Sequence, residues 1–139
     1  MDHVMVSHHL ALSLLSADGD DIPVVAELRY SAQDPLAVEA LFDDGTPDPV
    51  RWVFARDLLA AGLGRRTGDG DVVVWPTQDA QARPAVHLRL RSPNGDALLE
   101  APADAVADFL AATARLVPPG TEYQYFDIDE AFESLLGES

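Results

Sequence analysis

Residues 52–76 constrain the fold most, because they contain the junctions of a strand–helix–strand unit. Residues 52–54 carry the aromatic and β-branched side chains typical of a β-strand, which we expect to close here. Asp57 then falls in the first turn of a short helix, where its charge faces the positive end of the helix dipole. Phe54 precedes the expected cap and Leu59 takes the fourth helical position, a spacing that predicts a hydrophobic staple at this corner.

Glycine and proline set the far side of this helix. We expect the helix to stop at Gly62 in the left-handed conformation, which glycine adopts without steric cost. A glycine-rich arc over residues 64–70 then leads into a second strand. That strand is predicted from Asp71 to Trp75, with Pro76 ending it.

Alternating apolar residues predict further strands on both sides of this stretch. Before it, the alternation indicates strands at residues 4–14, 24–30, 38–42 and 50–54. After it, Val86, Leu88 and Leu90 form the expected core face of another strand, and residues 97–100 return as its hairpin partner. Because successive side chains on a strand point to opposite faces, the residues between these apolar positions are expected on the outer surface.

The periodicity becomes helical after Pro102. Val106, Phe109 and Thr113 follow helical spacing, and the prolines at 118 and 119 stop the helix. Tyr123 and Tyr125 are expected in a short extended piece. Asp127 is then predicted to cap a last helix. This helix would carry an apolar stripe of Ile128, Phe132, Leu135 and Leu136. The stripe would cover the sheet of its own chain, cover a neighbouring subunit, or bind in a groove of a partner.

These elements predict an α+β fold in a single domain over residues 1–139. The sheet is expected to be curved, mainly antiparallel and barrel-like, with about seven strands. One short helix interrupts the run of strands and two helices follow it. No internal repeat and no linker long enough for a second domain is visible in the sequence.

The composition excludes several classes of protein. The 139 residues are 47% hydrophobic and carry a net charge of −15, with no cysteine. Disulfides and thiolate chemistry are therefore excluded, and general attraction to nucleic acid or anionic membranes is disfavoured. No apolar run approaches the roughly 20 residues of a membrane span, and the N-terminus lacks the basic start of a signal peptide. We expect a cytoplasmic protein.

The charge is unevenly distributed along the chain. Between Arg51 and Arg91 there are seven arginines and four aspartates, a balance of +3, whereas the rest of the chain has two arginines and twenty acids. Two interpretations of this centre stay open: a docking surface for an acidic protein segment or a single strand of nucleic acid, or arginines that neutralise the chain's own carboxylates, which the net charge of −15 favours. The candidate residues of this surface are Arg65, Arg66, Arg83, His87, Arg89 and Arg91.

Motifs for catalysis, cofactors or metals are weak. The glycines at 62, 64 and 68 follow a helix and precede a strand, the reverse of a dinucleotide-binding loop. Counting from Asp18 as the first position of an EF-hand loop puts Arg29 where the bidentate glutamate belongs. His8 and His9 are adjacent on a strand and point to opposite faces, which does not suit one metal. We therefore expect no catalytic, cofactor-binding or metal-binding residue, and an enzyme is the third-ranked hypothesis.

A family resemblance rests on several longer segments. WVFARDLLAAGL followed by TGDGDVVVWP is similar to the signature of the SsgA-like sporulation and cell division proteins of actinomycetes, and SPNGDALLEAP, FLAATARLVPPGTEYQYFD and ESLLGES resemble the SsgB type of that family. The resemblance covers nearly the whole chain from about residue 22, although Arg66 stands where close relatives are expected to have proline. Its structural signature residues are Trp52, Phe54, Arg56, Asp57, Leu58, Leu59, Gly62, Gly70, Trp75 and Pro76.

The resemblance implies a non-enzymatic protein that helps to place the tubulin-like division GTPase FtsZ at sporulation septa. It acts by protein–protein contact, directly or through a membrane-associated SsgA-like partner. It also implies a homo-trimer and a fold like that of the Whirly single-stranded-DNA-binding proteins. Because fold does not fix function, binding of single-stranded nucleic acid is the second hypothesis.

Overall fold

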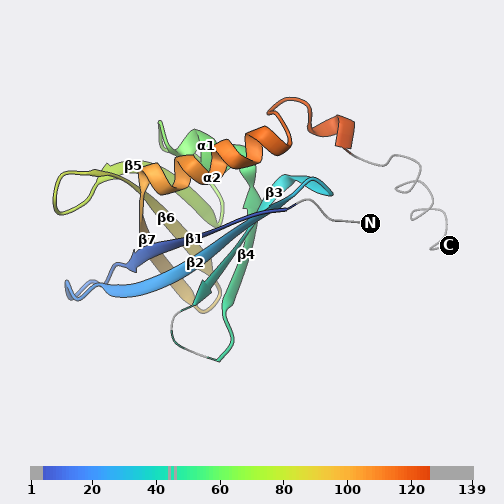
Figure 1. The fold of residues 1–139 in the computed structure, drawn as a ribbon. Helices are drawn as coiled ribbons and strands as arrows, with labels where there is room; N and C mark the ends of the chain where they lie inside the picture. Colours follow the sequence, from blue (N-terminus) through green and yellow to red (C-terminus); the bar gives the residue numbers. More distant parts are fainter. Residues whose placement is uncertain (1–4, 44, 46, 126–139) are drawn as a thin grey trace.

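A computed structural model describes residues 5–43, 45 and 47–125 of the chain. Seven strands in this part form one antiparallel sheet with the order β4-β3-β2-β1-β7-β6-β5 (Figure 1). The strands are β1 (Met5–Leu14), β2 (Ile22–Ser31), β3 (Asp34–Asp43), β4 (Val50–Ala55), β5 (Val72–Gln78), β6 (Pro84–Ser92) and β7 (Gly95–Pro102). The helices are α1 (Arg56–Gly62), α2 (Ala103–Leu116) and the 3-10 helix η1 (Glu122–Tyr125). The α+β prediction is confirmed, and the helix predicted after Asp127 lies outside the described residues.

The order of the strands requires the sheet to curl. β4 and β5 are consecutive in the chain but lie at opposite edges of the sheet. The seven-residue helix α1 joins them and contacts β3, β4 and β5. The two edges must therefore approach each other, and the sheet becomes a half-barrel with α1 across its open side.

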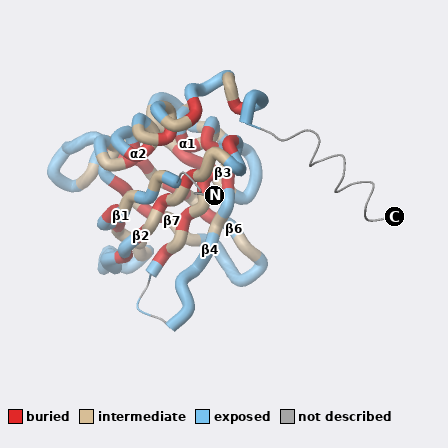
Figure 2. Tube along the Cα trace, turned by 45° about the vertical axis from the view of Figure 1, so that its right-hand side comes forward, coloured by how far each residue is buried: buried red, intermediate tan, exposed pale blue. Residues whose placement is uncertain are grey.

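The core follows the predicted alternation of side chains. β1 and β2 pair over ten residues, from Met5 opposite Ser31 to Leu14 opposite Ile22. The four expected core residues of β2 are all at most 5% exposed, and the expected core face of β6 is equally buried. In Figure 2, buried segments recur along the strands of the sheet and in α1 and α2.

Helix α2 covers the concave side of the sheet (Figure 1). It contacts β1, β6, β7 and α1, and it buries Val106 and Phe109 completely or almost so. The ring of His8 on β1 meets Phe109 edge-on, with centroids 5.6 Å apart. None of the described helices has the combined length and hydropathy of a membrane-spanning helix.

The role predicted for Gly62 is wrong in its mechanism. α1 does end at Gly62, but this residue has no positive φ, and Leu63 caps the helix in the right-handed conformation. A Cβ built on Gly62 would lie 2.2 Å from Cγ1 of Val74. Glycine is thus required because α1 packs closely on β5.

Three other boundaries also differ from the prediction. β5 continues through Pro76 to Gln78, because an edge strand has one side where a missing N–H costs nothing. β3 begins at Asp34, four residues before the predicted start, with Pro35 buried. Tyr123 and Tyr125 lie in η1 and not in an extended piece, because residues 121 and 124 close successive turns by backbone hydrogen bonds.

We expect Gly62→Ala to lower the free energy of unfolding by about 2 kcal/mol, since the added methyl group overpacks the contact with Val74. Gly64→Ala is the matched control, because the nearest atom to its Cβ would be 3.9 Å away. Urea denaturation of both variants measures the difference. Equal effects of the two substitutions would contradict the close approach of α1 and β5.

Candidate interaction surface

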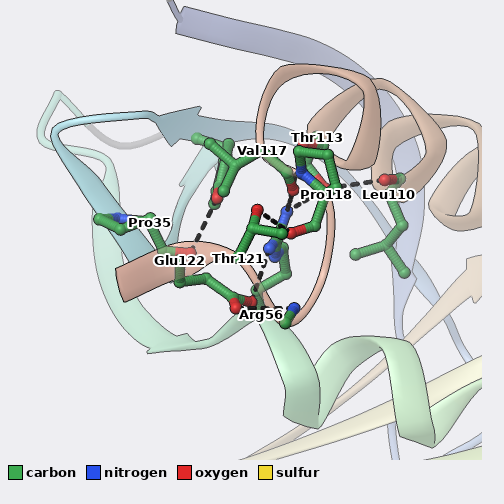
Figure 3. Close-up of polar contacts among 10 residues, drawn as sticks. Pro35, Arg56, Leu110, Thr113, Val117, Pro118, Thr121 and Glu122 are labelled. Carbon is green, nitrogen blue, oxygen red and sulfur yellow. Dashed lines mark hydrogen bonds and ion pairs between the residues drawn. The ribbon is translucent and has the colours of Figure 1, made fainter. Parts of the chain in front are cut away.

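Arg56 anchors the helices on which the candidate surface depends. It is the first residue of α1, and its side chain is 3% exposed. Its Nη1 donates to the carbonyl oxygens of Thr113 (3.2 Å) and Val117 (2.7 Å), as Figure 3 shows. The last carbonyls of a helix lack partners within it and carry partial negative charge. The guanidinium therefore satisfies and neutralises the end of α2.

The same guanidinium contacts two further elements, η1 and β2. Its Nη2 donates to Oε2 of Glu122 at 2.7 Å, which ties η1 to α1. Its Cζ lies 4.7 Å from the ring centroid of Tyr30, whose hydroxyl donates to the carbonyl oxygen of Pro35 at 2.8 Å. Glu122 Oε1 accepts the N–H of Gly120 at 2.8 Å. Elements from residue 30 to residue 122 thus converge on one buried cation.

The environment of this cluster shifts the pKa values of two groups. It favours the ionised form of Glu122 and the neutral form of Tyr30. The hydrogen bond from Arg56 is the main cause that lowers the pKa of Glu122, and the N–H groups of Glu122 and Gly120 add to it. Burial raises the pKa of Tyr30. Glu122 is therefore an anion and Tyr30 a neutral donor near neutral pH, as their hydrogen bonds require.

The outer face of β5, β6 and β7 carries a transverse row of polar and aromatic side chains. Trp75 lies opposite His87, which lies opposite Glu100. The two rings meet edge-on at 5.6 Å, and His87 Nε2 is 2.9 Å from Glu100 Oε2. The guanidinium of Arg66 lies over the indole, 4.5 Å from its centroid. This row is fixed on three strands and one loop.

The structure divides the six predicted surface residues into two groups. Three have carboxylate partners: Arg83 with Asp79 at 2.9 Å, Arg91 with Asp96 at 3.5 Å, and His87 with Glu100. Arg65, Arg66 and Arg89 meet no carboxylate among the described residues. Arg83 directly precedes β6 and Arg91 lies near its other end, so the six residues do not form one patch.

Most of the signature residues take part in packing. Phe54, Arg56, Leu59 and Gly62 are buried, whereas Asp57 is exposed in the first turn of α1 as predicted. The cap is Ala55, and both members of the predicted staple belong to the same core cluster. Trp52, Leu58 and Trp75 are half-buried, and Gly70 and Pro76 are exposed.

A second surface was missed by the sequence reasoning. On the outer face of β2, β3 and β4, Arg29 bridges Glu27 (3.0 Å) and Glu39 (3.5 Å), and Arg51 also contacts Glu39. The hydrogen bond from Arg29 is the main cause that lowers the pKa of Glu27. A hollow of about 170 Å³ beside this ladder exposes Met5 and Val53. Alternation had predicted the outward direction of Glu27 and Arg29, but only the strand register brings the four charges together.

The weak motifs take ordinary structural positions. The loop containing Gly64 and Gly68 runs from α1 to β5, so no helix N-terminus follows it. Asp18 lies in the turn between β1 and β2, where its N–H donates to the Ser16 hydroxyl at 3.2 Å. Among the described residues, no group of three or more His, Cys, Asp or Glu side chains has the geometry of a metal site.

Comparison with known proteins matches residues 24–122 to the family described as "Streptomyces sporulation and cell division protein, SsgA". The chain belongs to the SsgA family. It is 50% identical to sporulation-specific cell division protein SsgB of Streptomyces coelicolor over 134 residues, covering 96% of this chain and 97% of that protein. It is 44% identical to SsgB of Thermobifida fusca over 124 residues, covering 89% of each chain.

Two solved structures of SsgA-family proteins share the fold at a TM-score of 0.86. One is described as "Mutations in SsgB correlate to longitudinal cell division during sporulation of Streptomyces coelicolor"; it is 50% identical and covers 89% of this chain and 97% of its own. The other, an SsgA-like sporulation-specific cell division protein from Thermobifida fusca, is 40% identical and covers 96% and 97%. The family resemblance and the fold class read from the sequence are thus confirmed.

We expect Arg56→Met to lower the free energy of unfolding by about 3 kcal/mol, because it leaves the Glu122 carboxylate and the end of α2 without their donor. Arg115→Met is the matched control, since Arg115 is exposed in the last turn of the same helix. Urea denaturation monitored by circular dichroism measures both. A change as small as that of the control would show that the guanidinium does not anchor α2.

We expect Glu122→Gln to destabilise the protein at neutral pH and to do so less as the pH falls. The folded-state pKa of Glu122 lies below its ordinary value of 4.5, so its contribution is present above that value and is lost as the pH falls through the folded pKa. Melting temperatures of the wild-type and variant proteins between pH 7 and pH 3 should therefore converge. Other carboxylates titrate equally in both proteins and cancel. A constant difference would contradict the Arg56–Glu122 linkage.

Proposed function

We propose that this SsgA-family protein is a non-catalytic factor that positions or recruits the FtsZ division machinery at sporulation septa by protein–protein contact. The observation that carries the proposal is the 50% identity, over 96% of the chain, to a protein named for sporulation-specific cell division. The related Streptomyces coelicolor structure is described in terms of SsgB mutations that correlate with longitudinal cell division. A protein that influences how a cell divides has to act on the division machinery or on its placement.

The proposed partners follow from this role. They are FtsZ, or a membrane-associated SsgA-like protein that connects the chain to FtsZ, and further copies of the chain in a homo-trimer. We place the working protein in the cytoplasm at septa, with residues 1–139 acting as one SsgA-like domain. The net charge of −15 supports protein partners over nucleic acid, because a long polyanion meets repulsion from most of this surface.

The described chemistry supports a binding role more than catalysis. His87 contacts Trp75 and Glu100, and Arg56 donates hydrogen bonds to backbone carbonyls and to Glu122. A general base must lie within hydrogen-bond reach of the proton that it removes, either from the substrate or from a nucleophile. These groups instead hold strands and helices together.

We expect a fluorescently tagged copy, expressed in place of the native gene in a sporulating actinomycete, to form septal ladders that coincide with FtsZ. Deletion should prevent or misplace sporulation septa, because the machinery then lacks its positioning factor. Time-lapse microscopy of both strains measures these outcomes, with a strain carrying Gly64→Ala as the control for a neutral substitution. A diffuse tagged protein together with normal septation on deletion would reject the proposal.

A further inference from the structure

We propose that the Trp75 surface, defined as Arg65, Arg66, Trp75 and Arg89, binds a short acidic peptide segment of a partner protein. This inference rests on the proposed function, because it names the kind of partner that such a recruitment factor would recognise. It replaces the six-residue surface expected from the sequence with a smaller one chosen by the structure.

The first support is the pattern of charge pairing. The chain has 24 acidic residues and nine arginines. Five arginines lie within 4 Å of a carboxylate, and they are Arg29, Arg51, Arg56, Arg83 and Arg91. In the described part of the chain the other four have no such partner, and three of these lie on or beside β5 and β6. Although acids are abundant in this chain, these three arginines have no carboxylate partner in its described part. An acidic ligand could therefore form ion pairs with them.

The second support is the geometry around the indole. Arg66 lies over Trp75, and Arg65 precedes it in the same loop. Arg89 points to the same outer face as His87 and lies diagonally from Trp75, because Val73 is opposite Arg89. Such diagonal neighbours on a sheet are about 7 Å apart, within reach of long side chains. Arg65 and Arg66 are exposed, and Arg89 is partly exposed. Guanidinium groups are suited to bidentate contact with carboxylates.

The backbone at the edge of β5 disfavours the addition of a partner's strand to the sheet, so recognition through side chains is favoured. At the free edge of β5, Thr67 and Val74 exchange two backbone hydrogen bonds of 2.8 and 2.9 Å. Two residues further on, Pro76 has no N–H to offer. Edge strands protected in these ways do not readily accept another strand. A partner therefore has to bind through its own charged groups.

The same geometry favours a peptide over single-stranded nucleic acid. A base needs an open aromatic face for stacking, but Arg66 covers one face of Trp75 and His87 meets the ring edge-on. A short peptide also extends less far over the acidic remainder of the protein. At physiological salt, charges beyond about 8 Å are largely screened, so a few local carboxylates experience mainly the three arginines.

The test uses the full chain and a fluorescein-labelled hexaglutamate peptide in an anisotropy titration at physiological salt, where the distant acidic groups are screened. One variant combines Arg65→Gln, Arg66→Gln and Arg89→Gln. The matched control combines Arg51→Gln, Arg83→Gln and Arg91→Gln, which removes the same charge from arginines that already have carboxylates. We expect the first variant to bind the peptide about tenfold more weakly than the wild type, since three ion pairs of modest strength at the protein surface are lost. The control should remain within about twofold.

Equal weakening in both variants would overturn the proposal, because only net charge would then matter. No binding by the wild type, or tighter binding of hexathymidylate than of hexaglutamate, would also overturn it. Thermal melting of both variants establishes that they are folded. The septation assay separates the two proposals. If the wild-type protein binds the peptide in vitro but gene deletion leaves septation normal, the cellular role is rejected and the surface is not. The first variant is then placed in the same assay. Normal septal ladders together with lost peptide binding reject the surface as the one used for recruitment.

Discussion

One buried guanidinium holds the two layers of this protein together. α1 has seven residues, too few for a stable isolated helix, yet it has to bridge the two edges of the sheet. Arg56 fixes its first residue to the end of α2 and to η1, while Gly62 lets its last turn lie directly on Val74. Because both ends of the short helix are held by long-range contacts, the curl of the sheet and the position of η1 depend on the same interaction.

One arginine is buried in the inner layer, and others lie on the outer face of the sheet. The same residue type serves opposite purposes on the two sides. Arg56 is buried and donates from Nη1 and Nη2 to carbonyls and Glu122, whereas Arg66 lies over Trp75 without a carboxylate within the described chain. Between these extremes, Arg29 and Arg51 belong to a ladder with Glu27 and Glu39 that ties β2, β3 and β4 together. Pairing, not the number of arginines, therefore distinguishes a structural cation from one that is available to a partner.

Local patterns predicted most of the fold and less of the site. Alternation assigned Val24 to Tyr30 and Val86 to Leu90 to the core, because side-chain direction on a strand depends only on sequence spacing. It failed at Pro76, where the tolerance for proline depends on having an edge, and at Tyr123 and Tyr125, where η1 is held by Arg56. The candidate surface stays a prediction, and its six residues do not lie together: Arg83 pairs with Asp79 and Arg91 with Asp96, near opposite ends of β6.

The sequence by itself determined the family, the fold class and the strand faces, since these follow from side-chain periodicity, turn residues and long matching segments. It also determined that a surplus of positive charge lies between Arg51 and Arg91. Only the tertiary structure decided which arginine is buried, which have carboxylate partners and which have none among the described residues. The physical reason is that ion pairing and burial depend on distances between residues far apart in the chain, such as the 2.7 Å between Arg56 and Glu122, and no local pattern encodes those distances.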